Sequence, residues 1–177
     1  MSKEKTHYRK AFKSPYLSSA DIVGNTVLTV ARVTLEGDKS KKTKDQFNTM
    51  YFVERELRKG EPLKPMILNA CNSKTMRELT GSHYIDDWND IKITVYVDPN
   101  VRFGRETVEG LRISPKAPVQ YDQTKFDNNY PKWVQMIEEG KKTAHAIISM
   151  MSSGFSLSDS QFQKLRELEN IRVNDVK

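Results

Sequence analysis

The strictest pattern in the chain is an alternation of apolar and polar residues over Ile91–Val97. Isoleucine or valine fills every second position, and Lys92, Thr94 and Tyr96 lie between them. Because the side chains of a β-strand point alternately to two faces, this spacing predicts a strand with one buried face. The opposite face carries a cation and an aromatic ring, the groups that contact phosphates and stack bases in single-strand-binding proteins. A solvent-facing strand, with Tyr96 packed on the N-terminal segment, would give the same pattern.

Further strands surround this one. They are predicted from β-branched, alternating or short apolar runs at Asn25–Glu36, Phe47–Glu56, Met66–Asn69 and a closing segment from about residue 106 to Ile113. A short helix is expected after the third strand, with Asn72 or Ser73 as its cap and Gly81 at its left-handed end. The last two strands should be joined through 98–100, with a second turn near Gly104.

The resulting order is three strands, one helix and two strands. A small antiparallel barrel with its helix between the third and fourth strands has this order, which is the five-stranded Greek-key arrangement of the oligonucleotide-binding (OB) fold. We therefore expect a mainly β protein with added helices, in which residues 20–115 form an OB-like barrel. An α+β domain with an open antiparallel sheet is the alternative.

The segments outside the barrel have other compositions. Residues 1–19 are polar and basic with interspersed aromatics, which suggests an arm, and residues 116–128 hold prolines and no apolar period, which suggests a linker. Residues 129–177 are expected to form a helical extension. Pro131 suits the first turn of a helix through Met151, and Ser158 opens a last helix.

Charge and composition narrow the class of protein. The chain has 29 Lys+Arg against 23 Asp+Glu, a net charge of +6, and the lysines gather in the arm and in the loop 37–44. The single cysteine, Cys71, excludes an intrachain disulfide framework. No apolar run approaches the roughly 18 residues that span a bilayer, and no secretory signal is visible. We expect a soluble intracellular protein without membrane association.

Catalytic motifs are missing from the sequence. It has no phosphate-cradling glycine-rich loop, no nucleophile elbow and no zinc-protease motif. His83 near Asp86 and Asp87 matches no metal-ligand spacing, and these aspartates lack the companions of a magnesium-dependent nuclease. The expectation is therefore a protein that is not an enzyme and that needs no cofactor or metal.

The candidate site consists of basic and aromatic residues on the predicted strand faces and near the last connection. Lys92, Arg102, Arg105 and Arg112 are expected to meet phosphates, and Tyr51, Tyr96 and Phe103 to stack bases. Arg32 and Arg55 lie on strand faces that would adjoin Tyr96 in a barrel. The lysine-rich loop would add salt-dependent affinity, although it is equally typical of a solvated surface.

The chain resembles the small OB-fold single-stranded-DNA-binding proteins encoded by bacteriophages. The resemblance covers residues 20–115, in the opening strand Gly24–Glu36, the strand Leu63–Asn69 with the helix Ser73–Leu79, the residues Asp87–Asp90 before Ile91–Val97, and the closing strand Val108–Ile113. It implies sequence-tolerant binding of single-stranded DNA in phage replication, recombination or repair, in the cytoplasm of a bacterial host cell. Its implied partners are single-stranded DNA and replication or recombination proteins, with self-association left open.

One feature departs from the family, whose members often end in an acidic tail that recruits partners. The end of this chain, 169–177, is balanced in charge. A second hypothesis of another class also remains: a phage adaptor or inhibitor that binds a host or phage protein through its C-terminal helices. Its docking surface would consist of Trp133, Ile137, Ile147, Phe162 and Leu165.

Overall fold

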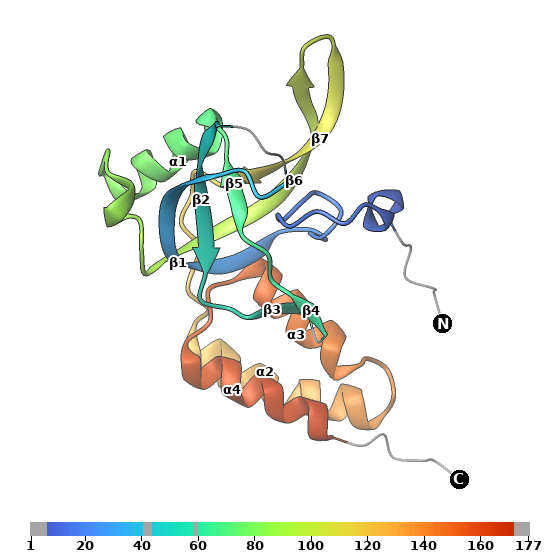
Figure 1. Ribbon diagram of the computed structural model, residues 1–177. Helices are drawn as coiled ribbons and strands as arrows, with labels where there is room; N and C mark the ends of the chain where they lie inside the picture. The colour runs from blue at the N-terminus through green and yellow to red at the C-terminus, as the bar shows by residue number, and fades with distance from the viewer. Residues whose placement is uncertain (1–6, 41–43, 59, 172–177) are drawn as a thin grey trace. The chain divides into compact units, whose positions relative to one another are not determined.

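The computed structural model describes residues 7–40, 44–58 and 60–171 (Figure 1). The chain divides into two compact units, Met1–Ala117 and Pro118–Lys177. The division falls shortly before Tyr121, which packs against the core of the second unit. Each unit has a hydrophobic core of its own and is described by itself.

Unit 1 is built on a five-stranded antiparallel sheet that curls into a half-barrel (Figure 1). Its strands are β1 (Thr26–Gly37), β2 (Gln46–Phe52), β5 (Met66–Leu68), β6 (Ile91–Phe103) and β7 (Glu106–Ile113). They lie in the order β5-β2-β1-β6-β7. The predicted five antiparallel strands are confirmed. The sheet is open, because within the described residues no strand pairing joins β5 to β7.

In sequence, the helix α1 (Ala70–Thr80) follows β5 and precedes β7. It contacts both of these edge strands. Its buried Asn72, 1% exposed, donates from Nδ2 to the carbonyl of Leu111 at 3.0 Å and accepts from the N–H of Ile113 at 3.1 Å. The predicted cap was therefore wrong: the capping side chain is Asn69, which accepts from the N–H of Asn72. The predicted end at Gly81 is confirmed, with φ of 71°.

The central strand β1 changes its buried side part of the way along. The pairing with β2 shifts register between Val30 and Arg32, which leaves Ala31 as an extra residue. A bulge of this kind reverses the in–out alternation and bends the strand. Val30 and Val33, an odd distance apart, are consequently both buried. Apolar residues from both alternating sets of positions in β1 are thus buried in one core, because the strand bends at the bulge.

The alternation in β6 is confirmed, since Ile93 and Val95 are fully buried in the core of unit 1. The predicted connection through 98–100 was wrong. β6 continues to Phe103 across a register shift between Asp98 and Val101, and the chain turns at Gly104, whose φ is 63°. A bulge admits Pro99 because the extra residues of a bulge need not donate to the ladder.

Smaller elements complete unit 1. The turn region predicted after β2 contains a two-stranded sheet of β3 (Glu56–Arg58) and β4 (Glu61–Pro62). The short 3₁₀ helices are η1 (Tyr8–Ala11) and η2 (Ile85–Asp87). After η1 the N-terminal segment enters the core, where Leu17 is buried and its N–H donates to the carbonyl of Pro65.

Unit 2 consists of α2 (Gln123–Glu138), α3 (Ala144–Gly154), α4 (Asp159–Glu167) and the 3₁₀ turn η3 (Leu168–Asn170). The start predicted for its first helix was wrong. The side chain of Asp122 caps α2 by accepting from the N–H of Lys125, so Pro131 lies inside the helix. The single predicted helix is also two, separated at Gly140, whose φ is 67°. The capping role of Ser158 in α4 is confirmed.

The side chains proposed to dock a partner build the core of unit 2 instead. Trp133, Ile137, Ile147 and Leu165 are buried, and only Phe162 is exposed, at 36%. Four of the five therefore already have their partners inside this unit. Within the described residues, every helix falls short of the length and apolar character that a membrane crossing requires.

Candidate nucleic-acid interface

The strand register brings five of the predicted site residues to one side of the sheet. Cross-strand pairs place Tyr96 opposite Arg112 and Arg32 opposite Tyr51, while Lys92 pairs with Thr29 between them. Each has at least one core residue beside it in the strand, so each points away from the core. We name this side the outer face and define it by the residues Arg32, Tyr51, Lys92, Tyr96 and Arg112.

The outer face is accessible, since Arg32 is exposed and its other four residues are partly exposed. Within it, Arg112 lies with its Nε 3.7 Å from a carboxylate oxygen of Asp98. Asp98 occupies the position diagonal to Arg112 on β6. Sequence reasoning placed Asp98 in a turn and therefore missed this ion pair.

The β6–β7 hairpin carries three more predicted residues beyond the outer face. Arg102, Phe103 and Arg105 are all exposed, and Phe103 is 78% exposed. Phe103 pairs with Glu106, and the even-numbered positions of β7 lead from there to Arg112, so Phe103 shares the side of the outer face. Arg102 pairs with Thr107 and lies on the opposite side.

Arg55 has no place in this register. It follows the end of β2 and directly precedes β3. Its backbone carbonyl accepts from the N–H of Leu63, which directly follows β4. Its side chain is exposed. The structure therefore separates Arg55 from the other predicted residues, because β2 ends before the predicted strand does.

Two cations surround the ring of Tyr51. The guanidinium carbon of Arg32 lies 4.1 Å from the ring centroid, and the Nζ of Lys39 lies 5.1 Å from it. Lys39 also donates to the Tyr51 hydroxyl at 2.7 Å, and that hydroxyl donates to Glu36 at 2.6 Å. The hydrogen bond to Tyr51 raises the pKa of Lys39, and the one from Tyr51 lowers the pKa of Glu36.

A shallow cavity of about 330 Å³ adjoins Tyr96. It is lined from the N-terminal segment by His7, Ser19 and Asn25, and from the hairpin by Glu109. The Nε2 of His7 lies 3.0 Å from a carboxylate oxygen of Glu109. The N-terminal segment thus reaches the hairpin beside the outer face.

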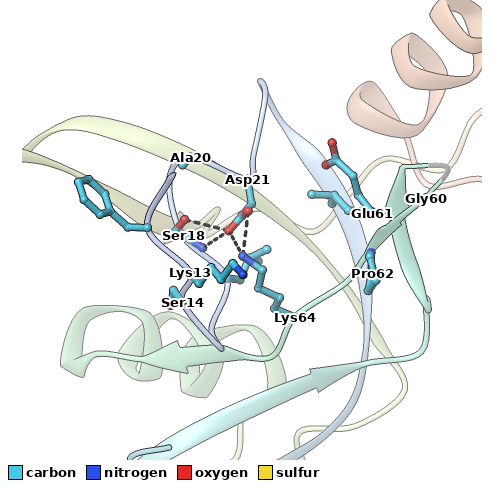
Figure 2. Close-up of a pocket in the computed structure, with 12 residues that line it drawn as sticks. Lys13, Ser14, Ser18, Ala20, Asp21, Gly60, Glu61, Pro62 and Lys64 are labelled. Carbon is cyan, nitrogen blue, oxygen red and sulfur yellow. Dashed lines mark hydrogen bonds and ion pairs between the residues drawn. The ribbon is translucent and has the colours of Figure 1, made fainter. Parts of the chain in front are cut away.

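A second cavity of about 340 Å³ lies between the N-terminal segment and the β3–β4 sheet (Figure 2). Asp21 points into it, where it accepts from the hydroxyl and N–H of Ser18 and from the Nζ of Lys64 at 3.1 Å. Burial acts to raise the pKa of Asp21, but these hydrogen bonds and the Lys64 ammonium outweigh it and lower the pKa below 3.8. Asp21 is therefore a charged structural anchor.

The described part of the chain was also compared with the ligand sets of metal sites and with known proteins. Its histidine, cysteine and acidic side chains form no group of three that could hold a metal ion. Comparisons with protein-family models, with curated proteins and with solved structures find no match.

Proposed function

We propose that this protein binds single-stranded DNA without catalysing a reaction. The strand register is the observation that carries the proposal, because it aligns Tyr96 with Arg112 and Arg32 with Tyr51 on one accessible face. Polynucleotide grooves combine cations for the backbone with aromatic rings on which bases stack. The resemblance to phage single-strand-binding proteins supports a role in phage DNA replication, recombination or repair in the host cytoplasm.

The topology of unit 1 supports the same proposal. Its main strands follow the OB order, with the helix between the third and fourth strands of the sheet. In that fold the ligand lies on the face of the second and third strands and is flanked by the loops after the first and fourth strands. Here these loops are the lysine-rich segment after β1 and the hairpin turn at Gly104.

The residues divide into two roles. Lys92, Arg105 and Arg112 would contact phosphates, and Tyr96 and Phe103 would stack bases. Tyr96 lies between cations on the sheet, whereas Phe103 offers an exposed ring on the extended hairpin. Since these contacts use charge and ring faces and leave the base edges unread, we propose sequence-tolerant binding.

A fluorescence-anisotropy titration of labelled oligo-dT tests the proposal. Replacement of Tyr96 or Phe103 by alanine should weaken binding about 5- to 150-fold, because each stacked base contributes about 1–3 kcal/mol. Tyr84→Ala is the matched control, since Tyr84 is 72% exposed in the segment between α1 and β6 and outside the outer face. It should leave the affinity unchanged.

The salt dependence supplies a second readout in the same experiment. Affinity should fall steeply between about 50 mM and about 200 mM salt, because each phosphate contact releases counterions. An unchanged anisotropy at micromolar protein and low salt would contradict the proposal. Equal losses in Tyr84→Ala and Tyr96→Ala would contradict the assignment of the site to the outer face.

A further inference from the structure

Lys39, which follows the end of β1, makes contacts through both its backbone and its side chain. Its Nζ donates to the Tyr51 hydroxyl and lies 3.5 Å from Glu36, while its backbone N–H donates to the Tyr16 hydroxyl at 2.6 Å. Tyr16 is itself buried. The side chain of Lys39 is thus held by the sheet and its backbone by the N-terminal segment, although the side chain remains 47% exposed.

Arg32 reaches the same ring from β1. Its guanidinium lies over the face of Tyr51 and within the distance at which a ring attracts a cation. Arg32 and Lys39 are therefore gathered by one tyrosine, through its ring and its hydroxyl respectively. Glu36 offsets one of the two positive charges, so the group of Arg32, Lys39 and Glu36 keeps a net charge of +1.

We propose that Arg32 and Lys39 form a binding site for one backbone phosphate of the single strand, and that Tyr51 is its positioning residue and stacks no base. This inference rests on the proposed function and changes the role of Tyr51 within it. A phosphate accepts charge-assisted hydrogen bonds from a guanidinium and an ammonium group. The sequence pattern does not distinguish Lys39 from the other lysines of its loop, and this proposal adds it to the site.

The geometry favours positioning over stacking. One face of the Tyr51 ring already carries the Arg32 guanidinium. The hydroxyl is engaged as donor to Glu36 and as acceptor from Lys39. A base-stacking tyrosine needs only its ring, whereas a positioning tyrosine needs its hydroxyl, and this difference can be measured.

Tyr51→Phe separates the two roles, because it keeps the ring and the charge of the protein and removes the hydroxyl. We expect the affinity for oligo-dT to fall about 3- to 10-fold and the slope of log affinity against log salt to shrink by about 0.7, the loss of one single-strand phosphate contact. Lys39→Ala should shrink the slope equally, and the double variant should be no weaker than Lys39→Ala. Tyr84→Phe is the control and should match the wild type.

A DNA-free readout separates this inference from the proposed function. Without the hydroxyl, limited trypsin digestion followed by mass spectrometry should show faster cleavage after Lys39 in Tyr51→Phe than in the wild type and in Tyr84→Phe. If the wild type binds oligo-dT while Tyr51→Phe keeps its affinity and slope, the inference is overturned and the proposed function stands. If the wild type fails to bind, the proposed function fails, and the phosphate site fails with it.

Discussion

Asp21 fastens the N-terminal segment to the rest of unit 1 through both its side chain and its backbone. The carboxylate accepts from Ser18 and Lys64, and the Asp21 carbonyl accepts from the guanidinium of Arg58 at 3.1 Å. Arg58 in turn pairs with Glu61. Asp21 is thus connected to Lys64, Arg58 and Glu61, and Figure 2 shows the part of this network formed by Ser18, Asp21 and Lys64.

Replacing Asp21 by asparagine should destabilise the protein by about 2 kcal/mol near neutral pH, because hydrogen bonds to a charged group are lost. The pKa of Asp21 is lower in the folded protein than its ordinary 3.8. The stability that this carboxylate contributes is therefore complete above that ordinary value and is lost as the pH falls through the lower, folded pKa.

Urea unfolding from neutral pH down to about pH 3 measures this dependence. The difference in unfolding free energy between the wild type and Asp21→Asn should shrink toward the acid end. Asp86→Asn, at an exposed position of η2, is the control and should differ little from the wild type at any pH. A difference that stays constant across the range would contradict the role given to the carboxylate.

Among single residues, those on the outer face could be predicted because a strand has a period of two. Lys92 and Tyr96 followed from the alternation of one strand, and the register confirms that Arg112 adjoins Tyr96. Glu36 and Lys39 could not be predicted as partners of Tyr51. Their meeting depends on how β1 and β2 pair across a loop, which no local pattern specifies.

At the scale of elements, α1 supplies hydrogen bonds to the backbone of the edge strand β7, as a further strand would. The Asn72 amide provides both an acceptor and a donor to the backbone of β7, as a neighbouring strand would. The connection also fixes the helix to the half-barrel. A buried amide with two backbone partners is therefore a structural joint between α1 and β7.

Asn72→Ala should lower the free energy of unfolding by about 2–4 kcal/mol, because the carbonyl of Leu111 and the N–H of Ile113 lose their partner in a buried place. Thermal unfolding followed by circular dichroism measures the loss. Asn89→Ala, at an exposed position before β6, should change the stability by less than about 0.5 kcal/mol. Equal effects of the two substitutions would show that Asn72 does not join α1 to β7.

The elements themselves were largely predictable, and their boundaries were less so. Alternation and β-branched runs located the five main strands, whereas the bulge after Asp98 was mistaken for a connection because Pro99 and Asn100 are typical turn residues. Pro131 suggested a helix start, although Asp122 begins α2 earlier. The partners of Asn72 lie some forty positions away on β7, so only the tertiary fold assigns its role.

At the scale of the whole molecule, two separate cores suggest two units that fold independently. The core of Met1–Ala117 contains the sheet and α1, and that of Pro118–Lys177 contains only helices and the segments between them. All nine residues of the predicted site belong to the first unit. The proposed binding activity should therefore reside there.

A chain that ends at Ala117 should unfold cooperatively and bind oligo-dT with the affinity of the full-length protein. The expectation follows because, among the residues that the structure describes, its core contains no side chain beyond Ile113. Circular dichroism and anisotropy, with the full-length chain as control, measure the two properties. Cooperative unfolding with lost binding would assign part of the site to unit 2, and a shortened chain without cooperative unfolding would contradict the independence of unit 1.

The central position of β1 also delays the completion of the sheet while the chain is being synthesised. During translation β2 emerges soon after β1 and can pair with it. The partner on the other side of β1 is β6, which begins only at Ile91. Until then the edge of Thr26–Val30 that faces β6 has no strand to pair with, and an unpaired edge invites association with other chains. The nascent protein therefore completes its sheet only after β6 and β7 emerge, and chaperones have that interval in which to act.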